Sequence, residues 1–165
     1  MATIKLVGSD DATSNSALGA DQFAMNKFTA VANGNMVEFK IKMQANGNVK
    51  VGVYADSAGE PAALLASVGS TAAVTGWNTI TIPSVSIVLG TDYWLAANQE
   101  LTTKIGVRND AGIYTMRFKT LAFANAFPDP AGTGYTNATD YMNIVAGWGS
   151  LPVIGGSDIH YFSEV

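Results

Sequence analysis

The residues that could support acid–base or nucleophilic chemistry are few. The chain has one histidine, His160, and no cysteine. Alternation in a strand would place Asp158 on the same face as His160, but no G-x-S-x-G motif is present to hold a strained nucleophilic serine. A surface histidine is therefore favoured over a catalytic one. The lack of cysteine excludes thiol nucleophiles, disulfide bonds and cysteine metal sites.

The glutamates do not form a pair suited to glycoside hydrolysis. That reaction needs two carboxyl groups about 5–10 Å apart, one of them in an apolar setting that raises its pKa. Glu38 lies on the polar face of a predicted strand, Glu60 in a turn, Glu100 at a strand end and Glu164 near the terminus. We therefore expect a protein that is not an enzyme.

Two loops are rich in the oxygen ligands that calcium prefers. Neither has the spacing of a known calcium loop, so solvated turns are favoured and no cofactor is expected, although calcium remains the alternative for both. The residues concerned are Asp10, Asp11, Ser14 and Asn15 in one loop, and Asp129, Asn137 and Asp140 in the other.

Two aromatic residues stand in glycine-containing settings. Trp148 lies between two glycines, where a turn would push it outward, and Tyr135 follows Gly134 in a long loop. An exposed ring can stack on a sugar, and neighbouring amides and carboxylates can bind its hydroxyls. We therefore predict Trp148, Tyr135, Asn137 and Asp140 as ligand-binding residues. The alternative is that the rings fold back onto the protein or are buried between subunits.

Composition limits the class of protein and of partner. A length of 165 residues fits one domain, residues 1–165. Hydrophobic residues make up 48% and charged residues 13%, which excludes a disordered chain. The formal net charge of −4 argues against nucleic acid and anionic membrane surfaces as partners. No apolar stretch is long enough for a membrane helix.

The start of the chain lacks the features of a secretory signal peptide. Two explanations stay open: a signal was removed, or the protein is made in the cytoplasm and reaches the exterior as part of a virion. In either case we expect an extracellular location, secreted or on a virion surface.

Alternating apolar and polar residues predict β-strands. Val37, Phe39 and Ile41 share one face of residues 36–43, and residues 49–54 alternate in the same way after an Asn-Gly turn, which predicts an antiparallel hairpin. Pro83 should end a strand at 76–82 or mark it as an edge. Residues 64–68 could be strand or a helical turn, and 124–140 form the longest loop. Further strands are predicted at 85–89 and 92–97, separated by a turn at Gly90-Thr91, and at 103–108, 113–120, 141–146 and 158–164.

Short strands at this spacing predict an all-β antiparallel β-sandwich of about eight to ten strands with little helix. We expect seven side chains inside it: Val37, Phe39, Ile41, Val51, Val53, Trp94 and Leu95. Trp94 and Leu95 are adjacent, so they point to opposite faces of one strand. Both can be buried only if that strand is covered on each side. Trp77 also lies in a strand pattern and is expected in the core.

Several short motifs follow one another between residues 28 and 97. Gly52-Val53-Tyr54-Ala55-Asp56 leads to Gly59-Glu60-Pro61 and Leu64-Leu65, and Gly76-Trp77 and Gly90-Thr91-Asp92-Tyr93-Trp94-Leu95-Ala96 come next. With these motifs, residues 28–97 resemble a group of bacterial and phage surface modules. These modules have a jelly-roll β-sandwich similar to carbohydrate-binding modules. The resemblance implies a jelly-roll sandwich and glycan recognition.

We therefore expect a non-catalytic binding module, for a glycan or for surface adhesion, whose partner is a glycan or cell-surface polysaccharide. The alternative is a structural virion protein, such as a phage decoration or receptor-binding component, that assembles as a homo-oligomer. Low charge would suit packing against identical copies, because such interfaces bury apolar area.

Overall fold

The computed structural model describes residues 3–10, 16–19, 21–100, 105–109, 114–139, 141–143 and 145–152. Throughout these ranges the regular elements are strands, and none is a helix. The strands are β1 (Ile4–Gly8), β2 (Ser16–Ala17), β3 (Gln22–Thr29), β4 (Gly34–Met43), β5 (Gly47–Ser57), β6 (Glu60–Ala73), β7 (Gly76–Ile87), β8 (Asp92–Gln99), β9 (Gly106–Asn109), β10 (Met116–Thr120), β11 (Thr136–Ala138), β12 (Tyr141–Asn143) and β13 (Val145–Ser150).

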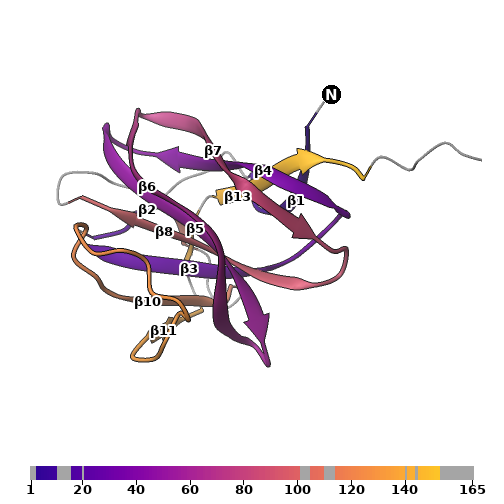
Figure 1. Ribbon diagram of the computed structural model, residues 1–165. Helices are drawn as coiled ribbons and strands as arrows, with labels where there is room; N and C mark the ends of the chain where they lie inside the picture. Colours follow the sequence, from indigo (N-terminus) through magenta and orange to yellow (C-terminus); the bar gives the residue numbers. More distant parts are fainter. Residues whose placement is uncertain are drawn as a thin grey trace, which may run out of the picture.

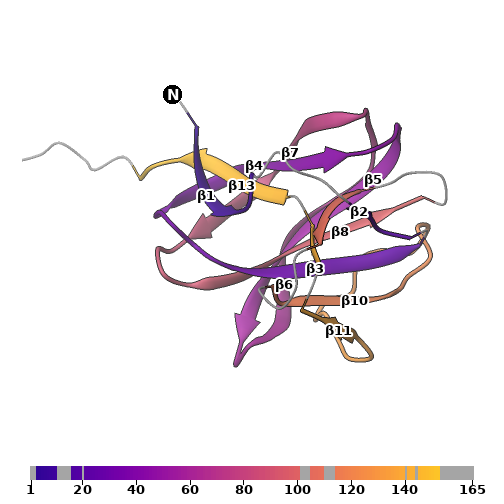
Figure 2. The ribbon, with the colours of Figure 1, turned by 180° about the vertical axis from the view of Figure 1, so that it is seen from behind.

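The strands form two large antiparallel sheets. One has four strands in the order β1-β13-β4-β7, and the other has six in the order β11-β10-β3-β8-β5-β6. Figures 1 and 2 show the two layers, with β11 beside β10 at one margin of the six-stranded sheet. A small third sheet, β12-β9-β2, is linked to β4 by the bridge between Met43 and Ile105. This arrangement confirms the predicted antiparallel β-sandwich.

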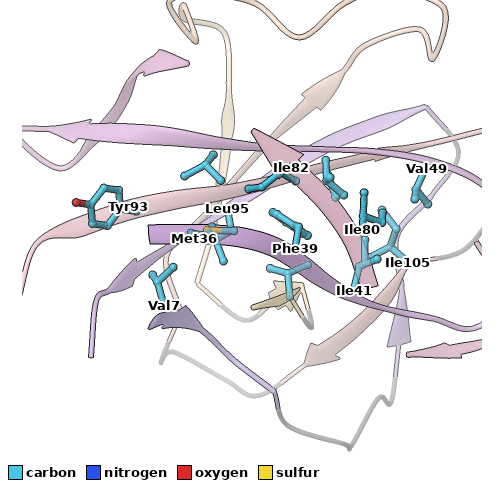
Figure 3. Close-up of a cluster of buried hydrophobic side chains, with 14 of the residues drawn as sticks. Val7, Met36, Phe39, Ile41, Val49, Ile80, Ile82, Tyr93, Leu95 and Ile105 are labelled. Carbon is cyan, nitrogen blue, oxygen red and sulfur yellow. The ribbon is translucent and has the colours of Figure 1, made fainter. Parts of the chain in front are cut away.

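The main core lies between the two large sheets. Phe39 and Ile41 from the four-stranded sheet, and Val51, Val53 and Leu95 from the six-stranded sheet, are all fully buried there, as predicted. Figure 3 shows part of this cluster, with Phe39, Ile41 and Leu95 among the labelled side chains. Alternation predicts these buried residues correctly because every second side chain of each strand points into this layer.

The strand predicted at residues 36–43, which lies within β4, departs from the prediction at Val37. The pairing of β4 with β7 is irregular between Met36 and Glu38, so Met36 is fully buried and Val37 only half-buried. The irregularity faces the part of β7 that contains Pro83, which cannot donate a ladder hydrogen bond. β7 continues past Pro83 to Ile87 and is an edge strand. Pro83 therefore marks an edge and does not end the strand.

The outer face of the six-stranded sheet is also covered. Residues 121–135, here called the covering segment, cross this face and bury Trp94 completely beside Phe127 and Tyr54. The Tyr54 hydroxyl donates a hydrogen bond of 2.8 Å to the Pro128 carbonyl. Leu95, on the opposite face, is in the main core. The prediction that this strand, β8, is covered on both sides is confirmed.

Three other predictions concern residues 64–68, the long loop and the strand at 158–164. Residues 64–68 are strand, within β6, and the long predicted loop is the covering segment followed by β11. The predicted strand at 158–164, with His160 and Asp158, lies outside the described residues.

Candidate functional site

Trp148 lies in a strand and not in the predicted turn. β13 runs through it and pairs with β1 on one side and β4 on the other. The flanking glycines allow close packing: a Cβ at Gly147 would lie 2.6 Å from Met36 Cε, and one at Gly149 would lie 2.6 Å from the carbonyl carbon of Asn35. Glycine at both positions thus permits close approach of neighbouring chains.

The Trp148 side chain is half-buried on the outer face of the four-stranded sheet. The Lys40 ammonium lies 3.7 Å from its ring centroid and so occupies one face of the indole. The Trp148 Nε1 is buried and has no hydrogen-bond partner among the residues that the structure describes. Trp77, predicted in the core, is 40% exposed on the same outer face, where it pairs in register with Lys42. The prediction for Trp77 is wrong because strand alternation places it with the exposed Thr79.

Tyr135 lies at the end of the covering segment and is half-buried against the six-stranded sheet. Its hydroxyl donates a hydrogen bond of 2.6 Å to the Ala131 carbonyl, and the Lys119 ammonium lies 4.2 Å from its ring centroid. Burial raises the pKa of the Tyr135 hydroxyl to about 12. The ring thus folds back onto the sandwich, which was the alternative to full exposure, and one side of it still borders a cavity.

That cavity has a volume of about 350 Å³, and we call it the Arg117 cavity. Arg117 on β10 and Asn137 on β11 are direct partners in the antiparallel register, so both side chains lie on one face. Two glycines of the covering segment, with φ of 77° and 81°, turn the chain around its rim. The cavity is lined by Glu60, Arg117, Gly132, Thr133, Gly134, Tyr135 and Asn137.

The structure therefore brings two of the four predicted ligand-binding residues together. Tyr135 and Asn137 line one cavity on the outer face of the six-stranded sheet. Trp148 is on the outer face of the opposite sheet and cannot share a site with them. Asp140 lies outside the described residues.

Arg117 is held in a fixed position in the cavity. Its Nε and Nη2 donate to the two carboxylate oxygens of Glu60 at 3.1 and 2.6 Å, and its Cζ lies 5.7 Å from the Trp94 ring centroid. Trp94 in turn donates from Nε1 to Asp56 Oδ1 at 2.8 Å. The hydrogen bond from Arg117 lowers the pKa of the Glu60 carboxyl. The result is a guanidinium whose orientation is set by an aromatic ring below it and a carboxylate beside it.

Two uncharged polar groups at the cavity are available to a ligand. The side chains of Asn137 and Thr133 are exposed, and no residue in the described ranges forms a hydrogen bond with either. The side-chain amide of Asn137 offers donors and an acceptor, and the hydroxyl of Thr133 offers both. Together with Arg117, these groups can bind a ligand rich in hydroxyl groups.

Sequence reasoning did not identify Arg117, Glu60 or Thr133 as site residues. The alternation of Met116, Arg117 and Phe118 predicted a strand with Arg117 on its polar face. The sequence did not show which loops would lie beside that face.

A second cavity, of about 460 Å³, lies on the other side of the covering segment and includes Lys50 and Phe123. The Lys50 ammonium donates to the carbonyls of Phe123 and Asn125, the latter at 3.0 Å. Two of the three donors of this ammonium are therefore used by carbonyls of the covering segment, which leaves fewer donors for a ligand than Arg117 has.

Of the candidate calcium ligands in the two oxygen-rich loops, Asp11, Ser14, Asn15 and Asp140 lie outside the described residues. In the part of the chain that is described, no cluster of three or more His, Cys, Asp or Glu side chains occurs. Asp10 pairs with Lys5 at 2.6 Å, and Asp129 Oδ1 accepts from the Leu64 amide at 3.0 Å. Over the same residues, no helix has the length and apolar character to cross a membrane.

Comparison of the chain with protein-family models, curated proteins and solved structures finds no match.

Proposed function

We propose that the protein is a non-catalytic binding module that binds a glycan in the Arg117 cavity. One observation carries the proposal: a fixed guanidinium, a tyrosine ring and two uncharged polar side chains converge on one cavity of about 350 Å³, and these two side chains have no hydrogen-bond partner among the described residues. That volume is at the small end of ligand pockets, which suits one or two sugar units. Sugar hydroxyls match the amide of Asn137, the hydroxyl of Thr133 and the donors of Arg117 that Glu60 does not use.

The charge of the cavity supports binding without catalysis. Within the described ranges Glu60 is the one carboxylate that lines it, and this group is ion-paired with Arg117. The pairing lowers the pKa of Glu60, whereas a general acid for glycoside hydrolysis needs a raised pKa. A glycan ligand also fits a protein that acts outside the cell or on a virion surface, and we include this location in the proposal.

The test is a glycan array followed by calorimetry with the best ligand. Asn137→Ala should weaken binding by about 1 kcal/mol, roughly fivefold, which is the usual contribution of one hydrogen bond. Asn125→Ala is the matched control, because Asn125 is also exposed on this side of the sheet but does not line the cavity. Equal affinities of the two variants would refute the cavity as the site, and no glycan retained on the array would refute the function.

We infer further that the sandwich is a jelly roll. This topology has eight strands, the first, eighth, third and sixth in one sheet and the second, seventh, fourth and fifth in the other. If β1, β3, β4, β5, β6, β7, β8 and β13 are taken as these eight, the observed orders β1-β13-β4-β7 and β3-β8-β5-β6 follow the scheme. The match supports the resemblance found in residues 28–97.

A role as a virion component that forms a homo-oligomer is the second candidate. An end of the sandwich carries four exposed aliphatic side chains, and a contiguous apolar patch is a common mark of a protein interface. The loops that hold three of them are joined by backbone hydrogen bonds of 2.9 Å between Ala30 and both Gly90 and Thr91, and the fourth follows Ser150, which pairs with Asn35 near the start of β4. The four are Val31, Val88, Leu89 and Leu151, exposed by 60%, 52%, 57% and 55%.

This second candidate is tested by the mass of the protein in solution. An oligomer that becomes monomeric in Leu89→Ser, but not in Leu65→Ser on β6, would favour it. A monomer at all concentrations would remove it and leave the glycan-binding function intact.

A further inference from the structure

The two partners of the ion pair in the Arg117 cavity differ in exposure. The Arg117 side chain is 14% exposed, whereas that of Glu60 is 62% exposed. Arg117 is the second residue of β10, a strand paired on both edges, and lies over Trp94, which is fully buried. Glu60 follows the tight turn between β5 and β6. The cation therefore belongs to the body of the protein, and the anion sits at the tip of a hairpin.

Glu60 is held weakly in this position. Within the described part of the chain, its carboxylate accepts hydrogen bonds from Arg117 and from no other group. Exposed ion pairs contribute little to stability, because water screens them and ordering the side chain costs entropy. The carboxylate of a ligand could replace that of Glu60 at little cost in free energy, because Arg117 would form bidentate hydrogen bonds with it in the same way.

A second cation lies next to the cavity. The Lys119 ammonium is 4.2 Å from the Tyr135 ring centroid, and its hydrogen-bond partner is a neutral carbonyl, that of Ala131, at 3.2 Å. No carboxylate among the described residues pairs with it. Among the described residues, the cavity lining holds one cation, Arg117, and one carboxylate, Glu60, and Lys119 adds a second positive charge beside Tyr135. This local excess of positive charge occurs in a protein whose net charge is −4.

We propose that the ligand of the Arg117 cavity is an acidic sugar, whose carboxylate displaces Glu60 from Arg117. This inference rests on the proposed glycan-binding function and names its ligand class. Glu60 acts as a stand-in for the ligand: it satisfies Arg117 in the empty protein and moves into solvent when the sugar binds. The sugar hydroxyls bind Asn137 and Thr133. These neutral groups favour a sugar over an acidic peptide.

The first experiment compares matched acidic and neutral probes by calorimetry. Trigalacturonate is paired with its methyl ester, and sialyllactose with the methyl ester of its sialic acid. At least one acidic probe should bind about tenfold or more tightly than its neutral partner, because a charged hydrogen-bond pair is lost in the latter. The preference should shrink as salt is added. Equal binding of each acidic probe and its neutral partner would overturn the acidic-sugar inference and leave glycan binding standing. No binding of any glycan would overturn both.

The second experiment removes the charge of Glu60, the carboxylate that competes with the ligand for Arg117. Glu60→Gln should tighten binding of the acidic probe several-fold and leave the neutral probe unchanged. Glu38→Gln, the same charge change on the opposite sheet, should alter neither. Weaker binding of the acidic probe by Glu60→Gln would show that Glu60 itself contacts the ligand and would overturn the inference.

The third experiment removes the cation. Arg117→Gln should abolish the preference for the acidic probe, and Lys5→Gln, on β1, should keep it. Arg117→Lys retains the charge without the fork of donors and should lose part of the preference. A circular dichroism spectrum checks the fold of each variant, and the exposed Glu60→Gln keeps the inference testable if Arg117 variants do not fold. A glutamate-rich peptide that competes with the sugar at equal affinity would overturn the assignment to sugars.

Discussion

Substitution of Gly149 by alanine should strongly destabilise the protein. The added Cβ would lie 2.6 Å from the carbonyl carbon of Asn35 and 2.9 Å from the Cα of Met36. Both are backbone atoms of β4, at a point where the register of β13 and β4 is already irregular. Because backbone cannot rotate away as a side chain can, the two strands must separate. We expect a loss of about 3 kcal/mol, the upper end for overpacking.

Two other glycines provide a graded comparison. A Cβ at Gly147 would meet the flexible end of Met36, with Cε at 2.6 Å, and Val7 Cγ1 at 2.9 Å, so side chains can move and the expected loss is about 1–2 kcal/mol. At Gly69 a Cβ meets nothing within 4 Å. Alanine there should be neutral or stabilise by up to about 1 kcal/mol through the unfolded state.

Urea unfolding followed by circular dichroism measures all three variants on one scale. The expected order of stability is Gly69→Ala, then Gly147→Ala, then Gly149→Ala. A domain of this kind has about 5–15 kcal/mol in total, so the largest loss is easily resolved. If Gly149→Ala were as stable as Gly69→Ala, or more stable than Gly147→Ala, the reasoning from close strand approach would be refuted.

Three further predictions concern aromatic residues. Trp148→Ala should cost about 1–2 kcal/mol of stability, less than a fully buried tryptophan, and leave glycan affinity unchanged; a tenfold drop in affinity would move the site to the four-stranded sheet. The pKa of Tyr135 is about 12 against an ordinary 10, so the folded state keeps a proton that the unfolded state loses, and stability falls as the pH rises above about 10. Tyr135→Phe should therefore lose less stability in alkali, and an unchanged alkaline unfolding curve would contradict this. Phe127→Ala should cost about 3 kcal/mol and shift tryptophan emission to longer wavelength as water reaches Trp94; unchanged emission would show that Phe127 does not shield the ring.

Alternation predicted the core well where strands have one buried face. The side chains of Phe39, Ile41, Val51 and Val53 are buried because the period of two does not depend on which strand lies opposite. The adjacent pair in β8 was informative in another way. Trp94 and Leu95 point to opposite faces of this strand, so both are buried only if each face is covered. The main core buries Leu95, and the covering segment buries Trp94.

Predictions that needed the identity of a neighbouring strand failed. Glycines beside Trp148 are compatible with a turn or with close approach, and the choice depends on Asn35 and Met36, more than a hundred positions earlier in the chain. Val37 was misplaced because a bulge opposite Pro83 shifts the alternation. In both cases the local pattern was correct and the tertiary partner decided the outcome.

The candidate site was half predictable for the same reason. Tyr135 and Asn137 stood out because a loop aromatic and a nearby amide suit sugar recognition. Arg117 is a candidate site residue because the folded chain places Glu60, from a distant hairpin, beside it. A polar residue on a strand gives no sign of which loop will meet it.

The place of β13 has a consequence for how the protein is made. β1 pairs with β13 and, in the part of the chain described, with no other strand. About 140 residues separate the two, so at the usual pace of synthesis the first strand waits roughly 7–30 s for its partner. During that time the apolar side chains of Leu6 and Val7 lack the sheet that later buries them. β4 also waits with one edge open, and the lysines along it can discourage pairing with another nascent chain.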